Sequence, residues 1–89
     1  MITMRYFAAA RAARGVDQEA VQWTGPLDGL LAHVVERTAA EGAGLTAGGL
    51  SLAEVFERCT FLVNGARAER SVQLGDGDRL DVLPPFAGG

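Results

Sequence analysis

The chain contains no lysine; its eight basic residues are all arginine. Without a side-chain amine, it cannot be joined to a copy of itself through an isopeptide bond. It also has only one cysteine and one histidine among 89 residues, which excludes an internal disulfide and a metal site built from several such ligands. We therefore expect no bound metal and a reducing, cytoplasmic environment.

Long apolar runs and an excess of positive charge are missing as well. No apolar stretch approaches the ~18 residues that would cross a membrane. The net charge is −3, so the basic stripe that binds nucleic acid is not expected. We expect neither a membrane nor a nucleic acid as partner, and the negative net charge favours a partner with a basic surface.

The size and the patterning predict one small domain that begins with a hairpin. A hydrophobic fraction of 48% in 89 residues is enough for a single core. Residues 2–8 alternate between apolar and polar side chains, which is typical of a strand. Residues 17–23 predict a second, more polar strand, and residues 9–16 an Ala/Arg/Gly connection between the two, with Gly15 as a turn residue.

A helix and three further strands complete the predicted order. Thr24-Gly25-Pro26 marks a helix start, and apolar residues then recur every three or four positions for about four turns, up to Gly42. A glycine-rich loop over 42–50 follows, and Ser51 is expected to cap a short helical turn. The predicted strands cover 61–63, 67–74 (a weak edge strand) and 79–83, with turns at Asn64-Gly65 and 75–78.

This order predicts an α+β fold: a mixed sheet of about five strands with one main helix packed on one face. If the first and last strands pair in parallel at the centre, the chain leaves from the middle of the sheet. The side chains expected to face the helix are Ile2, Met4, Tyr6, Leu30, Leu31, Val34, Phe61, Val63, Leu80 and Val82.

The most distinctive motif is the final run Pro84-Pro85-Phe86-Ala87-Gly88-Gly89. Two glycines without side chains can thread a narrow tunnel and carry the Gly89 carboxylate towards a partner's active site. That carboxylate is ionised and unreactive at neutral pH, so an ATP-dependent partner would have to adenylate it. We expect a domain over residues 1–83 and a flexible tail over 84–89; the alternative is an ordinary glycine-rich terminus.

Three segments resemble the ubiquitin-like β-grasp sulfur carriers, most closely the small subunit of molybdopterin synthase. They are Arg5-Tyr6-Phe7-Ala8 with Arg11, Phe61-Leu62-Val63-Asn64-Gly65, and the stretch from Asp76 to Gly89. The 42–50 loop looks longer than is typical of that family.

The resemblance implies a mechanism in which the chain is a carrier and not an enzyme. A partner related to ubiquitin-activating enzymes would use ATP and magnesium to adenylate Gly89, and a sulfur relay protein would supply the sulfur of a thiocarboxylate. The large catalytic subunit of molybdopterin synthase would then take up the tail, and two carriers would provide the dithiolene sulfurs. The carrier itself would bind no cofactor.

Other pathways stay open for such a carrier. They include the thiazole of thiamine, cysteine, thiolated tRNA and sulfur-containing natural products, although Pro84-Pro85 favours the molybdopterin branch. A ubiquitin-like modifier is a further alternative, and so is a stand-alone interaction module, which would need no free terminus. A carrier gains about 16 Da when oxygen is replaced by sulfur, whereas a modifier becomes attached to other proteins.

Strict alternation places Phe7, Leu62 and Leu83 on the face of the sheet opposite the helix. An uncovered face with three large apolar side chains indicates a partner surface, with Arg5 and Arg67 as ionic contacts at its rim. Scattered apolar residues and ordinary solvated charges are the alternative. The lone Cys59 is interpreted as a small buried hydrophobic residue.

Overall fold

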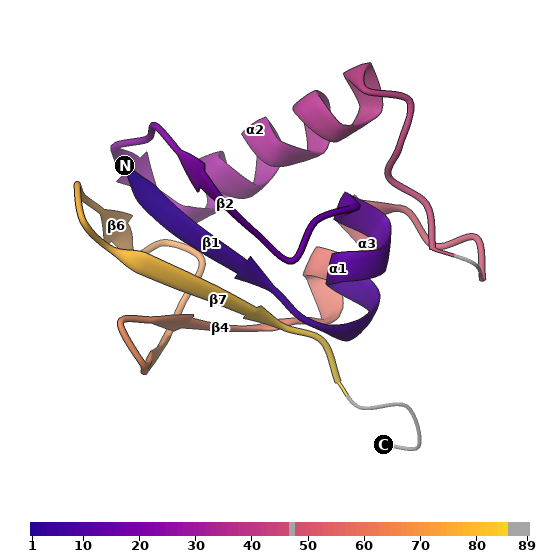
Figure 1. Ribbon diagram of the computed structural model, residues 1–89. Helices are drawn as coiled ribbons and strands as arrows, with labels where there is room; N and C mark the ends of the chain where they lie inside the picture. The colour runs from indigo at the N-terminus through magenta and orange to yellow at the C-terminus, as the bar shows by residue number, and fades with distance from the viewer. Residues whose placement is uncertain (47, 86–89) are drawn as a thin grey trace.

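The computed structural model describes residues 1–46 and 48–85. It contains a five-stranded sheet in the order β2-β1-β7-β4-β5 and a small sheet that pairs β3 with β6 (Figure 1). The elements are β1 Ile2–Tyr6, α1 Ala8–Arg14, β2 Gln18–Val21, β3 Gly25–Pro26, α2 Leu27–Ala40, α3 Leu52–Arg58, β4 Thr60–Val63, β5 Ala66–Ala68, β6 Gln73–Leu74 and β7 Arg79–Leu83. The predicted α+β class, a mixed sheet of about five strands with a main helix on one face, is confirmed.

Strand β7 lies at the centre of the sheet. It pairs in parallel with β1, from Thr3↔Arg79 to Tyr6↔Val82, and antiparallel with β4 on its other side. The first and last strands therefore do pair in parallel at the centre, which is the condition under which the chain was expected to leave from the middle of the sheet. The chain leaves β7 between two neighbouring strands, away from the N-terminal end of β1 (Figure 1).

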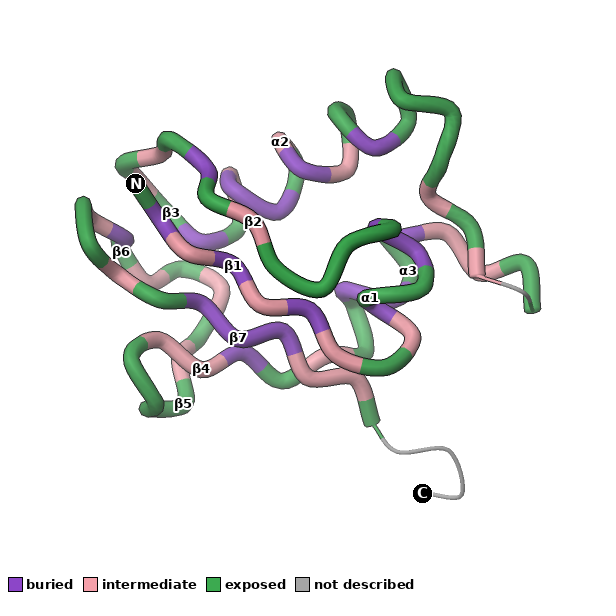
Figure 2. The backbone as a smooth tube through the Cα atoms, viewed as in Figure 1, coloured by how far each residue is buried: buried purple, intermediate pink, exposed green. Residues whose placement is uncertain are grey.

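The core lies between the sheet and the helices. Buried and half-buried residues alternate along β1, whereas β7 is buried continuously from Leu80 to Val82 (Figure 2). Of the ten side chains expected to face the helix, nine are buried and Val63 is half-buried against the core. In the described ranges, no helix is both long and apolar enough to span a membrane.

The predicted connection over residues 9–16 contains a helix that the sequence analysis did not predict, because α1 occupies most of it. Its sequence, Ala-Ala-Ala-Arg-Ala-Ala-Arg, consists of the strongest helix formers. Gly15 ends the helix at φ 92°, a left-handed conformation that favours glycine. The helix packs Ala10 and Ala13 into the core, so the link between β1 and β2 contributes to the hydrophobic layer.

The start of α2 also differs from the prediction. Thr24 does not cap the helix; Pro26 is the N-cap residue, and Gly25–Pro26 forms β3 against β6. The backbone N–H groups of Leu27 and Asp28 donate to carbonyl groups of the 70–72 segment at 2.8 and 2.9 Å. That segment satisfies the first helical donors, and it splits the predicted 67–74 strand into β5 and β6.

Helix α3 and the turn between β4 and β5 form where the sequence predicts them. Ser51 Oγ accepts from Glu54 N at 3.2 Å, and Glu54 Oε1 accepts from Ser51 N at 3.2 Å, which forms a capping box for α3. Asn64 and Gly65 have φ values of 51° and 86°, as the turn between β4 and β5 requires.

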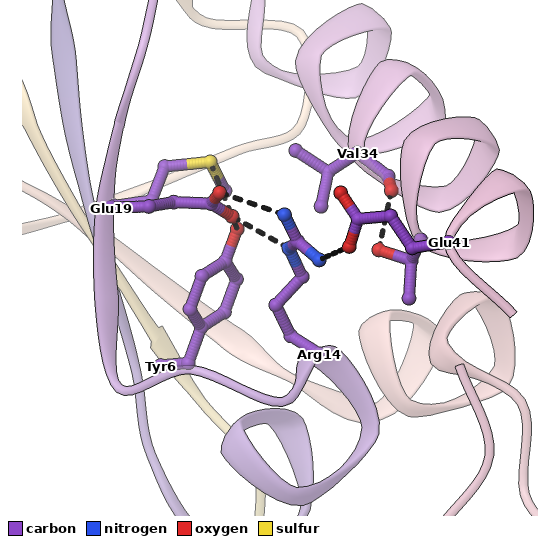
Figure 3. Close-up of polar contacts among 7 residues, drawn as sticks. Tyr6, Arg14, Glu19, Val34 and Glu41 are labelled. Carbon is purple, nitrogen blue, oxygen red and sulfur yellow. Dashed lines mark hydrogen bonds and ion pairs between the residues drawn. The ribbon is translucent and has the colours of Figure 1, made fainter. Parts of the chain in front are cut away.

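A partly buried polar cluster connects α1 to the rest of the molecule (Figure 3). Arg14 donates to both carboxylate oxygens of Glu19 at 2.7 and 2.8 Å and to Glu41 at 2.6 Å, while Tyr6 donates to Glu19 at 2.6 Å. Burial opposes ionisation of Glu19, yet the bonds from Arg14 and Tyr6 hold its pKa below the ordinary value. The cluster connects β1, β2, α1 and the end of α2.

Candidate functional site

The C-terminal segment leaves the sheet beside the corner between β1 and α1. Pro84 is half-buried and Pro85 is exposed. Prolines at these positions cannot donate to a neighbouring strand, so they favour an end to the sheet pairing where β7 stops at Leu83. The remaining tail residues that sequence analysis singled out, Phe86, Ala87, Gly88 and Gly89, lie outside the described residues.

Phe7 forms the neighbouring corner. Its N–H donates to the carbonyl of Val82 in β7 at 3.3 Å, and its own carbonyl accepts from Ala10 N at 3.0 Å. The next residue, Ala8, has φ 48°, a left-handed conformation that costs an alanine about 1 kcal/mol. The corner therefore holds Phe7 next to the end of β7 at the expense of local backbone strain.

The three apolar residues of the predicted partner surface lie where alternation places them. Leu62 is paired with Asp81, and Leu83 with Thr60, on the face opposite the helices. Phe7, Leu62 and Leu83 are each half-buried. We call this side of the five-stranded sheet the open face. The structure groups the three side chains around the exit of the tail, and their role in docking stays a prediction.

Charged side chains form a row on the same face. Asp81 is paired with Arg5 on one side and Leu62 on the other, and Leu62 is paired with Arg67 at the edge. Asp81 Oδ1 lies 3.6 Å from Nε of Arg5 and 3.6 Å from Nε of Arg79. The Arg5 guanidinium also lies 5.4 Å from the centroid of the Phe7 ring, within the range of a cation–π contact.

Sequence reasoning missed two charged residues of the open face, Arg79 and Asp81. The signal was present, because both alternate with the core residues Leu80 and Val82 and so share a face with Leu83. The side chain of Asp81 is only 10% exposed. Among residues 1–46 and 48–85, its Oδ1 atom has no hydrogen-bond partner.

The lone cysteine is poorly suited to nucleophilic chemistry. Cys59 is half-buried, and its Sγ donates to the carbonyl of Val55 at 3.1 Å. Burial raises the pKa of its thiol to about 11, so the reactive thiolate is scarce at neutral pH. Within the described ranges, no group of three His, Cys, Asp or Glu side chains could hold a metal ion.

Comparison with known proteins gives a family and a fold. The model of the ThiS family matches residues 4–89. A putative molybdopterin converting factor subunit 1 from Pyrococcus furiosus has 23% identity and a TM-score of 0.66, over 96% of this chain and 97% of that one. Small archaeal modifier protein 1 from Haloferax volcanii has 20% identity and a TM-score of 0.65, over 96% and 97%.

A third solved structure is a complex. Subunit 1 bound to subunit 2 of the molybdopterin-converting factor from Helicobacter pylori has 20% identity and a TM-score of 0.61, over 99% of this chain and 97% of the matched one. Among curated protein sequences, none is significantly similar to the chain. At these identities, the structural matches establish the shared fold.

Proposed function

The chain belongs to the ThiS family of ubiquitin-like sulfur carriers, and from this membership we propose that it carries sulfur as a thiocarboxylate on Gly89, with Gly89 as the terminal residue of the functional chain. The observation that carries the proposal is the position of β7: the central strand ends at Leu83, and Pro84-Pro85 leave the sheet beside a half-buried apolar surface. This arrangement fits a carrier whose folded domain binds the partner while its C-terminal segment supplies the reacting group.

The proposed chemistry takes place on partner enzymes. A Gly89 carboxylate oxygen attacks the α-phosphorus of ATP on an adenylating enzyme, with magnesium assisting as pyrophosphate leaves. A persulfide sulfur from a relay protein then attacks the acyl carbon and AMP departs. A thiol cleaves the resulting acyl disulfide and leaves the thiocarboxylate. The chain supplies the reacting carboxylate and no acid, base or bound cofactor.

We propose the large catalytic subunit of molybdopterin synthase as the acceptor, in a cytoplasmic pathway to the molybdopterin dithiolene. Two observations support this choice: Pro84-Pro85 before the tail and the similarity to a converting-factor subunit 1 whose structure includes its subunit 2. The similarity to a small archaeal modifier protein favours a second candidate, covalent modification of other proteins.

The decisive measurement is the intact mass of the purified protein after incubation with the adenylating enzyme of the same organism, ATP, magnesium and a persulfide donor. We expect a gain of about 16 Da that requires all components. Deletion of Gly89 should abolish the gain and leave the melting temperature unchanged, because a terminal residue makes few native contacts. A chain extended beyond Gly89 that still gains sulfur without being cleaved would contradict the proposal.

The acceptor is tested separately. The thiocarboxylated protein is mixed with the large subunit and the pterin precursor, and dithiolene formation is measured. Formation of molybdopterin supports the acceptor proposed here. Accumulation of amide conjugates on lysines of other proteins, without molybdopterin, would replace it with the modifier function.

A further inference from the structure

The helix side of the molecule carries a groove between α2 and α3, with a volume of about 350 Å³. Leu31 and Phe56 form its apolar floor, and each is 1% exposed. Ala32 on α2 and Ala53 on α3 also line the groove and are exposed. Their small side chains leave open the space that larger ones would fill in a close-packed interior. Alanines on both helices therefore leave room for side chains from outside the molecule.

A second apolar hollow, of about 180 Å³, continues the groove towards the glycine-rich loop. The two hollows share Val35 and Ala53. Leu45 lines the second hollow and is 66% exposed, more than any other large apolar side chain in the described ranges. The loop is held against α3, because Leu52 N donates to the carbonyl of Gly44 at 2.7 Å. The loop therefore places an exposed leucine at the end of the groove.

The rim of the groove is acidic. Glu36 and Glu57 are both exposed, and neither forms an ion pair in the part of the chain that the structure describes. Arg70 also lines the groove, but its Nη2 atom already lies 2.7 Å from Oδ1 of Asp28. Three carboxylates and one guanidinium give the lining a net charge of −2. The groove therefore combines an apolar floor with negative charge that is left unpaired.

The walls of the groove limit the form of its occupant. Both walls are helices, whose backbone groups bond within the helix, so an extended peptide would find no strand to pair with. A helical occupant pairs its own backbone and needs only side-chain contacts. Helix α2 has 14 residues, which is about 21 Å at 1.5 Å per residue. A partner helix of about four turns would match that length.

We infer that the groove between α2 and α3 binds an amphipathic helix of a partner protein, with apolar side chains on the floor and lysines or arginines opposite Glu36 and Glu57. The basic partner that the net charge favours would then bind on the helix side, since the arginines of the open face would repel it. Figure 1 shows α2 and the end of β7 at opposite sides of the molecule. This partner and one that acts on Gly89 can therefore bind together, and the inference does not depend on the proposed function.

The test is an NMR titration of the full chain, labelled with ¹⁵N, with a synthetic helical peptide of about four turns. The peptide has leucines along one face and arginines on both sides of them. We expect saturable shift changes at groove residues such as Ala32, Val35 and Ala53. A second peptide with glutamate in place of each arginine should bind at least about tenfold more weakly. Shift changes centred on the open face, or equal affinity for the two peptides, would overturn the inference.

Variants separate the groove from general attraction between opposite charges. Glu36→Arg and Glu57→Arg should each raise the Kd of the basic peptide at least about fivefold, because each places like charges in opposition. Asp17→Arg is the matched control: it makes the same charge change at an exposed position between α1 and β2 and should alter Kd less than about twofold. Leu45→Ser changes no charge and should raise Kd about threefold through a lost apolar contact. Equal weakening by folded Asp17→Arg and Glu57→Arg would overturn the inference.

Two further measurements identify a different occupant if there is one. Sedimentation of the chain alone should show a monomer; a dimer that Glu57→Arg dissociates would make a second copy the occupant and overturn the inference. Glu57→Arg should gain about 16 Da as the wild type does, and its failure to do so while folded would assign the groove to the adenylating enzyme. If the peptide binds as expected but the wild type never gains sulfur, the groove stands and the carrier proposal is wrong.

Discussion

The two faces of the central sheet place residues of the same strands in different environments. In β7, Leu80 and Val82 are fully buried under the helices, whereas Asp81 and Leu83 lie on the open face between arginines and the exit of the tail. Because side chains alternate with a period of two, adjacent residues of one strand belong to different environments. Substitutions one residue apart should therefore change the stability and the proposed partner binding independently.

The largest expected effect is on the helix side. Leu31 is 1% exposed in α2, so Leu31→Ala should lower the free energy of unfolding by about 2–5 kcal/mol, through lost transfer energy and a residual cavity. Denaturant titration measures the change. Binding per folded molecule should be unaffected. Ordinary surface substitutions change the free energy of unfolding by about 0.5 kcal/mol or less. A loss no larger than that would contradict the assignment of this face to the core.

The next effect is on the open face. Phe7→Asp should weaken binding to the proposed large subunit by at least ~2 kcal/mol, because a charge replaces a large apolar group in the predicted interface. The fold should survive, since Phe7 is the N-cap residue of α1 and aspartate is a preferred N-cap.

Leu83→Asp is the companion to Phe7→Asp and lacks the capping role. Both variants are measured by calorimetric titration and by thermal melts. Normal binding by both would place the docking surface elsewhere. Unfolding by Phe7→Asp together with an intact Leu31→Ala would mean that the faces are reversed.

A smaller effect is expected at the polar cluster that joins the two sides. Glu19→Gln should lower the free energy of unfolding by about 1–2 kcal/mol at pH 7, because hydrogen bonds to an ionised carboxylate are stronger. The pKa of Glu19 in the folded chain is below its ordinary value of 4.5. The wild type's advantage should therefore be complete above about pH 5, shrink as the pH falls below 4.5, and vanish once Glu19 is protonated in both states.

Urea titrations of the wild type and Glu19→Gln across this pH range measure the difference. An advantage that stays constant from pH 7 to pH 3 would show that the charge of Glu19 does not stabilise the cluster.

The smallest effect is at the corner between the two faces. Ala8→Gly should raise the free energy of unfolding by about 0.5 kcal/mol, because glycine accepts φ 48° without the penalty of a Cβ atom. This value is a net gain, since the greater freedom of glycine in the unfolded chain offsets part of the relieved strain. Ala12→Gly, at an exposed position within α1, is the matched control and should lower stability by about 0.5–1 kcal/mol. Equal destabilisation by both variants would contradict strain at Ala8.

Much of the fold could be predicted because it depends on local patterns. Four features can each be recognised from a few neighbouring residues. They are the alternation in residues 2–6 and 79–83, the helical period in α2, the capping box at Ser51 and the Asn64-Gly65 turn. Helix α1 was missed although its alanine-rich sequence is a local signal, since the two flanking strands suggested a plain hairpin. The candidate site was predictable in its apolar members, because alternation alone assigns Phe7, Leu62 and Leu83 to one face.

Periodicity and composition require no knowledge of distant contacts, so the sequence alone is enough to predict the two-layer architecture and to show the lack of lysine and the Gly88-Gly89 motif. Only the tertiary structure decided which charges meet. Arg14 reaches Glu19 and Glu41 across 5 and 27 residues of sequence, and Arg5 and Asp81 become neighbours through a parallel pairing of the first and last strands. Electrostatic partners depend on register and burial, which arise only when the strands and helices pack together.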